Sequence, residues 1–415
     1  MCPQNVRTGL NIMVGRRLGA TLALTVAVPL ALAACNNKDD GAAPAPRSGA
    51  SRAPAAPPGP VSLAISPPSG SRNMPVSTEI GLDVSGGTVT RVALAGADGK
   101  AVAGTLRDDG SAWVPSRPLK TRQRYVATVT AADGAGQPTT ATTTFTTMGT
   151  PGRRTGTGLY LFDDRTYGVA MPVVAEFSPG IKKKDRPAVQ KRMFVRTDPP
   201  QPGTWSWTSS GTQAYYRAPS YWKPGTTLTV RIAVGGLPTG GGRYGDQDRS
   251  ATAKIGRSLV MTVDNRTKKM TVVRDGATIR TMPVSLGKPS TPSSSGTMVV
   301  MEKATSTVFD TTDTDGARGY KMTIGYAQRL TWSGQYIHSA PWSVGAQGHR
   351  NVSHGCVNLS PSNARWLFGR TLIGDPITVR GTGDKLVYGN GWTPWDLSWP
   401  EFAKGSALPV PAELG

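Results

Sequence analysis

The sequence predicts a mostly β fold. Its 415 residues include 50 glycines and 34 prolines, and only 7% are aromatic. Such a composition favours β-rich domains joined by turns over helical bundles. Residues 125–130 and 228–234 alternate apolar with smaller or polar side chains, as strands with one buried face do. At roughly 100 to 200 residues per domain, the length predicts two to four domains.

Residues 1–35 have the features of an export signal. Arg7, Arg16 and Arg17 precede an apolar run over 18–31, which is shorter than the ~20 apolar residues that a membrane span needs. The run ends in Leu-Ala-Ala-Cys at 32–35, which resembles the lipobox of bacterial lipoproteins. That resemblance implies cleavage before Cys35, lipidation of its sulfur and a membrane anchor. An ordinary cleaved signal is the alternative, and either Met1 or Met13 can be the start.

The cysteines single out one thiol. Cys2 lies in the predicted signal and Cys35 at its end, so the mature chain keeps Cys356 as its free thiol. In an oxidising compartment a lone thiol is a liability unless it is buried or used. Cys356 is therefore a candidate nucleophile.

The chain is strongly basic, with a formal net charge of +21. Such a charge attracts polyanions. Nucleic acid is excluded as a partner by the predicted export, so anionic cell-wall polymers or lipid headgroups fit better. A generally basic exported protein without such a partner is the alternative.

The chain divides into six predicted parts. Residues 1–35 are the signal, and the Ala- and Pro-rich stretch 36–60 is a disordered linker. Residues 61–149 and 150–252 are two β-sandwich modules of immunoglobulin-like length, each with a Pro-Ser lead-in before its main strand. Neither shows catalytic residues, so we expect spacers. Residues 253–381 form a β-rich catalytic domain, and 382–415 a Trp-rich tail.

Local signals place several elements in the last two parts. Residues 259–263, 270–273 and 377–379 are predicted strands, and Asp275-Gly276 predicts a hairpin turn because glycine tolerates positive φ. The Gly-, Ser- and Thr-rich stretch 287–320 favours a mobile flap over regular structure. Trp392, Trp395 and Trp399 of the tail are expected to pack on a neighbouring domain.

The chemistry gathers around Cys356. All three histidines, His338, His349 and His354, lie within residues 338–354, just before the thiol. A thiol with a pKa of about 8.5 is mostly protonated at neutral pH, and an imidazole can take its proton or stabilise the thiolate. Gly355 permits a tight turn, so that the N–H groups of Gly355 and Cys356 can face an oxyanion. Zinc binding by these side chains is a weaker alternative, because no further ligand lies at metal spacing.

The motif resembles the signature of a known family. His338, fourteen intervening residues and then Ser353-His354-Gly355-Cys356-Val357-Asn358 match the L,D-transpeptidases of bacterial cell walls. Gly287-Lys288, Thr291-Pro292 and Gly296 are similar to an upstream element of that family, and the domain order resembles its actinobacterial lipoprotein members.

The resemblance implies a role for each matching residue. Cys356 is the nucleophile, His338 its base, the Ser339 carbonyl orients His338, and His354 and Gly355 shape the turn. Substrate-contact positions are Tyr320, Ser333, Gly334, Ser353 and Asn358. His349 matches no family position and is expected in a loop.

The implied activity is 3→3 cross-linking of peptidoglycan stem peptides through a cysteine thioester, with release of D-alanine. It requires no cofactor and no metal, and it implies inhibition by carbapenem-type compounds. The implied location is the extracytoplasmic face of the membrane, reaching into the wall. Hydrolysis by an L,D-carboxypeptidase or cysteine peptidase, and a non-catalytic wall-binding lipoprotein, are the alternatives.

Overall fold

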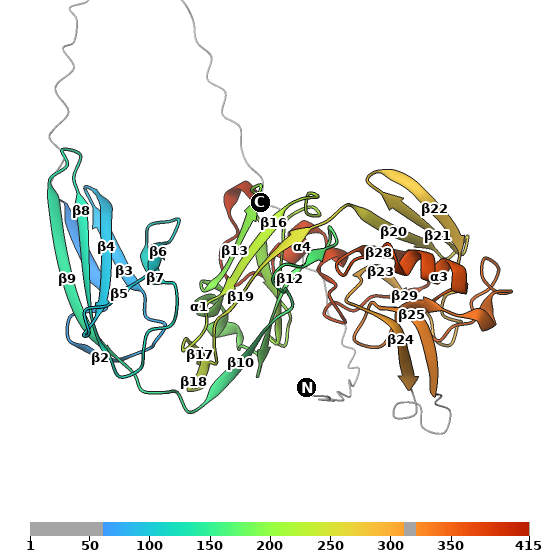
Figure 1. The fold of residues 1–415 in the computed structure, drawn as a ribbon, viewed down its shortest axis with the longest axis horizontal. Coiled ribbons are helices and arrows are strands. Elements are labelled where there is room, and N and C mark those ends of the chain that lie inside the picture. The colour runs from blue at the N-terminus through green and yellow to red at the C-terminus, as the bar shows by residue number, and fades with distance from the viewer. Residues whose placement is uncertain (1–60, 311–320, 415) are drawn as a thin grey trace, which may run out of the picture. The chain divides into compact units, whose positions relative to one another are not determined.

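The computed structural model of the protein describes residues 61–310 and 321–414 (Figure 1). Within them, strands form six sheets, two in each of three successive stretches of chain, and no sheet mixes strands of two stretches. The predicted mostly β fold is confirmed, because helices are confined to short segments. Across the same residues no helix is long and apolar enough to cross a membrane.

The first stretch is a β-sandwich. Alternate residues of its central strand are buried, namely Tyr125, Ala127, Val129 and Ala131, which confirms the strand predicted there. One sheet has the order β1 (Ser62–Ser66), β3 (Ile80–Ser85), β7 (Ala112–Pro115) and β6 (Gly104–Leu106). The other has the order β2 (Ser71–Met74), β9 (Pro138–Thr147), β8 (Arg124–Ala132), β4 (Thr88–Gly96) and β5 (Ala101–Val102).

The second stretch is another sandwich. One sheet has the order β14 (Thr204–Trp207), β15 (Gln213–Arg217), β12 (Val173–Ser178), β10 (Arg154–Leu159), β18 (Arg243–Gly245) and β17 (Pro238–Gly240). The other has the order β11 (Thr166–Tyr167), β19 (Arg249–Ile255), β16 (Thr227–Ile232) and β13 (Met193–Asp198), and the short helix α1 (Arg186–Gln190) precedes β13. The boundary predicted at residue 252 falls inside β19, which stays paired with β16 as far as Lys254.

The third stretch carries the motif. One sheet has the order β22 (Ala277–Pro283), β21 (Lys269–Arg274), β20 (Leu259–Asp264), β28 (Pro376–Arg380), β23 (Ser294–Val299) and β29 (Asp384–Lys385). The other has the order β24 (Glu302–Asp310), β25 (Lys321–Arg329), β26 (Tyr336–Ser339) and β27 (Val357–Leu359). The predicted hairpin joins β21 to β22, and Asp275 and Gly276 have φ of 50° and 86°.

Helix α3 (Pro361–Phe368) follows β27 directly and packs against β25 and β26. It begins where Ser360 Oγ accepts a hydrogen bond from the Asn363 N–H, and Pro361 occupies a first-turn position that needs no N–H donor. Its buried side chains Ala364 and Leu367 join the core between the sheets. The helix thereby holds the strand that follows Cys356.

The expectation that 287–320 lacks regular structure was wrong for much of that stretch. Residues 294–299 form β23 and residues 302–310 form β24. Pairing with β28 and β25 stabilises these strands despite their Ser- and Thr-rich sequence, since neighbouring strands supply the backbone partners. Residues 311–320 lie outside the described part of the chain.

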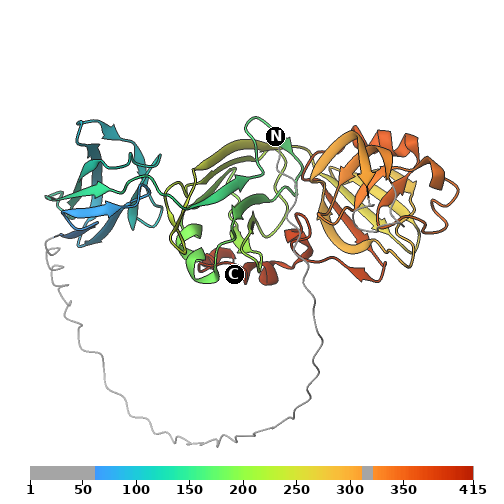
Figure 2. The same cartoon turned by 90° about the horizontal axis from the view of Figure 1, so that it is seen from below.

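The tail packs on the second sandwich, as predicted (Figure 2). Trp392 and Phe402 belong to the hydrophobic core of that sandwich, together with Val299 and Met301 of the third stretch. Trp395 donates its indole N–H to the Ala170 carbonyl at 2.7 Å. The tail also contains the short helix α4 (Trp399–Ala403), whose N-terminus is closed by a capping box. Val299, Met301 and the tail therefore extend the core of the second sandwich, while the third stretch also has a core of its own.

Candidate active site

Parallel pairing of β26 and β27 brings the predicted base and nucleophile together. His338 is opposite Asn358 in the register, and Cys356 precedes β27 by one residue. Because side chains alternate along a strand, His338 and Asn358 share one face, and continuing the register places Cys356 beside them. The Cys356 thiol donates to the Gly334 carbonyl, with 3.8 Å between sulfur and oxygen.

The imidazole of His338 is held in one orientation. Its Nδ1 lies 2.9 Å from the Ser339 carbonyl oxygen, which only accepts, so Nδ1 carries the proton and Nε2 the lone pair. The ring is buried, with Phe309 at 5.6 Å and Trp342 at 6.0 Å between ring centroids. Burial lowers the pKa of His338, and the bond to Ser339 opposes that shift. Nε2 is thus suited to accept a proton at neutral pH.

The thiol of Cys356 is also in its neutral form. The residue is only 7% exposed, and burial raises the pKa of Cys356 to about 12. Of the two ways in which an imidazole can activate a thiol, this environment favours proton transfer during attack over a resting ion pair. Both groups are therefore uncharged before substrate binds.

Ser353 and Gly355 shape the turn that presents Cys356. Ser353 Oγ donates to the Cys356 carbonyl at 2.7 Å and accepts from the Gly355 N–H at 3.1 Å. Gly355 has φ of 121°, a conformation that favours glycine. The predicted use of the Gly355 N–H toward an oxyanion is wrong for this structure, because that donor is engaged by Ser353. Ser353 itself is buried, with its hydroxyl directed into the turn.

The other predicted residues occupy different surroundings. Gly334 borders the thiol, while the neighbouring Ser333 is exposed and bonded to Asn390 of the tail. Asn358 is buried and donates its amide to Ser343 Oγ at 3.2 Å, and its Oδ1 has no hydrogen bond among the described residues. It therefore lies buried on the strand face that it shares with His338.

The remaining histidines lie at the surface. His354 is exposed, with Nε2 at 3.1 Å from Lys288 Nζ. His349 is exposed in a turn, as expected. Tyr320 and Cys35 are outside the described residues, so their predicted roles remain predictions.

Sequence reasoning missed two side chains next to the site. Asn390 and Gln335 hold the loop that precedes β26, through bonds to Ser333 and Ser294 respectively. Gln335 lies only three residues before His338, which is a weak positional signal. Nothing in the sequence distinguishes Asn390, because its partner is 57 residues away.

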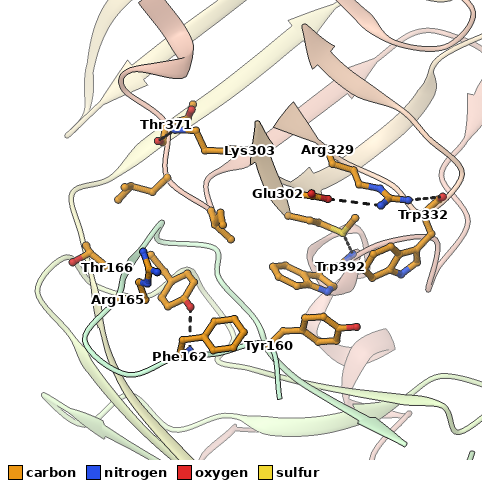
Figure 3. A pocket seen from close by; sticks show the side chains of 14 residues that line it. Tyr160, Phe162, Arg165, Thr166, Glu302, Lys303, Arg329, Trp332, Thr371 and Trp392 are labelled. Atoms are coloured by element: carbon orange, nitrogen blue, oxygen red, sulfur yellow. Dashed lines mark hydrogen bonds and ion pairs between the residues drawn. The ribbon is translucent and has the colours of Figure 1, made fainter. Parts of the chain in front are cut away.

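A separate cavity of about 530 Å³ lies between the second sandwich and the third stretch (Figure 3). Tyr160, Trp332 and Trp392 contribute aromatic walls, and Arg329 donates to the Trp332 carbonyl at 3.1 Å. None of the predicted site residues that the structure describes lines it. It is therefore distinct from the thiol site.

Comparisons with known proteins match most of the chain to one family. A family model described as the L,D-transpeptidase catalytic domain matches residues 258–379, and one described as a bacterial Ig domain matches residues 71–238. L,D-transpeptidase 2 of Mycobacterium tuberculosis is 33% identical over 350 residues, covering 83% of this chain and 85% of that protein.

L,D-transpeptidase 5 of the same organism is 33% identical over 414 residues, covering 96% of this chain and 87% of its own length. A solved structure of an L,D-transpeptidase in complex with imipenem is 36% identical in sequence, with a TM-score of 0.46. The match covers 54% of this chain and 97% of the chain in that structure. The catalytic-domain model matches the stretch that holds Cys356, and the two relatives are similar to this chain over most of their length. The chain belongs to the L,D-transpeptidase family.

Proposed function

We propose that the protein forms 3→3 cross-links in peptidoglycan through a thioester on Cys356. The main support is the pairing of β26 with β27, which places His338 and Cys356 on one face of the sheet. Burial favours the neutral form of both side chains. Membership of the L,D-transpeptidase family supports the reaction class. The substrate is a tetrapeptide stem, and the acceptor is the side-chain amine of a second stem.

The first half-reaction forms the acyl-enzyme. As Cys356 Sγ adds to the carbonyl carbon of the third stem residue, His338 Nε2 takes the thiol proton. The backbone N–H of Cys356 is the donor that we assign to the oxyanion, since the Gly355 N–H is engaged by Ser353. The carbon–nitrogen bond then breaks, and the amine of the leaving D-alanine takes the proton from His338.

The second half-reaction transfers the acyl group. The acceptor amine adds to the thioester carbonyl and gives one proton to His338, and Sγ leaves and recovers that proton. The Ser339 carbonyl keeps the imidazole in the same tautomer for both halves. No metal or nucleotide enters the scheme, because the stem peptide bond supplies the energy of the thioester.

Anchoring at the membrane is a further part of this proposal. It rests on the lipobox-like residues that end at Cys35. The basic character of the chain separately suits binding to anionic wall polymers. The test is the location of Cys35→Ala in cells: release into the medium is expected, and unchanged membrane retention refutes the anchor.

Incubation with a disaccharide-tetrapeptide and mass spectrometry of the products tests the activity. A dimer that has lost one alanine is expected, whereas a tripeptide alone means hydrolysis and a carboxypeptidase. His338→Ala should abolish the dimer, and His349→Ala, an exposed histidine in a turn, is the matched control. Carbapenems should add covalently to Cys356, as their strained carbonyl resembles an activated amide. Failure of the wild-type protein to give either product favours a non-catalytic role.

A further inference from the structure

The loop between β25 and β26 forms one wall of the thiol site. Its Gly334 carbonyl accepts a hydrogen bond from the Cys356 thiol, and Gly334 has φ of 94°, a backbone conformation that favours glycine. Thr331 fastens the loop internally, because its Oγ1 accepts from the Gln335 N–H at 3.0 Å and lies 3.1 Å from Ser333 Oγ. The position of Gly334 therefore depends on how this loop is held.

The tail holds the loop through Asn390. Asn390 Oδ1 accepts from the Ser333 N–H at 3.0 Å, and its Nδ2 donates to Ser333 Oγ at 2.9 Å. Asn390 thus bonds to both the backbone and the side chain of the residue next to Gly334.

Asn390 is itself fixed by its neighbours. Gly391, the next residue, lies so close to the loop that a Cβ built on it would meet the Leu330 carbonyl oxygen at 2.7 Å. The Gly391 carbonyl accepts from the Tyr215 hydroxyl of the second sandwich at 3.0 Å. The tail backbone at 390–391 is therefore packed between β15 and the loop, and it is a rigid support for Ser333.

We propose that Asn390 is a positioning residue for acylation of Cys356: by holding Ser333 it fixes the Gly334 carbonyl, and with it the place of the sulfur. This inference rests on the proposed role of Cys356 as nucleophile. Without the two bonds the loop gains freedom, Gly334 moves, and the sulfur samples positions away from the line of attack. A misplacement of about 1 Å can cost up to about 100-fold in rate.

Two variants and one control test the proposal in the full chain. Asn390→Leu keeps the branched shape of the side chain and removes both bonds. Asn390→Asp keeps the acceptor for the Ser333 N–H, and its second oxygen accepts from the Ser333 hydroxyl. Gln201→Met is the matched control, since Gln201 also makes one accepted and one donated bond, to the Lys223 N–H and the Tyr221 carbonyl.

The readouts are the first-order rate of thioester formation at saturating carbapenem, KM and kcat for cross-linking, and urea unfolding. Asn390→Leu is expected to lower the acylation rate and kcat about tenfold or more with KM changed less than about threefold. Asn390→Asp should return to within about threefold of the wild type. Gln201→Met should leave both rates unchanged.

Other outcomes overturn the inference. An acylation rate for Asn390→Leu within twofold of the wild type means that the internal bonds of Thr331 are sufficient to position the loop. A raised KM at unchanged kcat means that Asn390 serves substrate binding only. Equal losses in both Asn390 variants mean that the bonds are not the cause. Product formation by Cys356→Ala would instead refute the proposed nucleophile, and that result is separate from all of these.

Discussion

Arg217 links the second sandwich to the tail. It lies at the end of β15 and is only 2% exposed, and it donates from Nη2 to the Leu397 carbonyl at 2.8 Å and from Nε to the Pro394 carbonyl at 3.1 Å. Its guanidinium lies 4.4 Å from the ring centre of Phe402 and 4.6 Å from that of Trp395. None of the carboxylates in the described residues forms an ion pair with it, so carbonyls and rings compensate the charge.

Arg217→Met separates the polar contribution from packing. Methionine fills much of the same apolar volume between the rings, but it makes no hydrogen bond. A bond from a charged donor contributes about 1.5 to 3 kcal/mol, and the bonds to the Pro394, Leu397 and Ser398 carbonyls of the tail are lost, the last two of which share Nη2. Burial of the guanidinium lowers the pKa of Arg217 to about 10, which shows that part of this gain offsets desolvation. The net loss in the free energy of tail docking is therefore expected to be about 2 to 4 kcal/mol.

Hydrogen exchange of the 385–410 backbone amides measures that loss. Exchange there should speed up by a factor of about 30 to 700, since each 1.4 kcal/mol is tenfold. Arg186→Met is the control, because Arg186 also bonds to two carbonyls, of Ile181 and Ser209, and lies over the Trp207 ring, on the same sandwich. If tail exchange in Arg217→Met matches that in Arg186→Met, the tail is held by its apolar contacts alone and the reasoning is wrong.

Three further predictions concern the thiol and the limits of the catalytic unit. Cys356→Ala should abolish cross-linking, with a free energy of unfolding within about 1 kcal/mol of the wild type, and residual dimer in the product assay refutes the nucleophile. Activity should stay constant as the pH falls to 6.5 and decrease only below it, because burial lowers the pKa of His338 and the base must be neutral. The free energy of unfolding should decrease over the same pH range, since the unfolded chain binds that proton more readily. A midpoint above 6.5 in the pH–rate profile contradicts this. Residues 149–415 should fold and cross-link soluble stems. Residues 254–415 keep the core of the third stretch but lose the one that Val299, Met301 and Trp392 enter, so they should unfold at a lower urea concentration, and an equal urea midpoint would refute the importance of these contacts.

Local patterns in the sequence predicted the strands and the main pair of the site. Alternation in β8 and β16 and the Asp-Gly turn of β21 and β22 are short-range signals that the structure retains. The spacing of His338 and Cys356 predicted their chemistry because the motif itself forms the two adjacent strands. Strand β24 escaped prediction, since its Thr and Ser residues form a strand only when β25 is beside them.

Long-range contacts account for the rest. The Ser353 hydroxyl accepts a hydrogen bond from the Gly355 N–H, so that N–H is not available to an oxyanion. The spacing of residues in the motif does not reveal this bond. Asn390 and Arg217 have partners 57 and more than 170 residues away in the chain, so their roles appear only in the fold. An isolated Arg in a strand is usually a solvated side chain, and here it is buried because the tail brings carbonyls and aromatic rings to it.

The expectation that both sandwiches act as spacers needs correction for the second and stays a prediction for the first. Val299 and Met301, at the end of β23 and just after it, are buried in the core of the second sandwich, and a fragment without that sandwich would expose them with Trp392. Removing the first sandwich leaves this core intact, since no residue of the first sandwich belongs to it. The contacts between the two sandwiches include an ion pair of Glu79 in the first with Arg192 in the second, and Glu79 also pairs with Arg107. When the first sandwich is removed, water can solvate Arg192, which costs less free energy than exposing a hydrophobic core. A spacer role thus stays a prediction for the first sandwich alone, while the second sandwich, through the tail that packs on it, supports the loop beside Cys356.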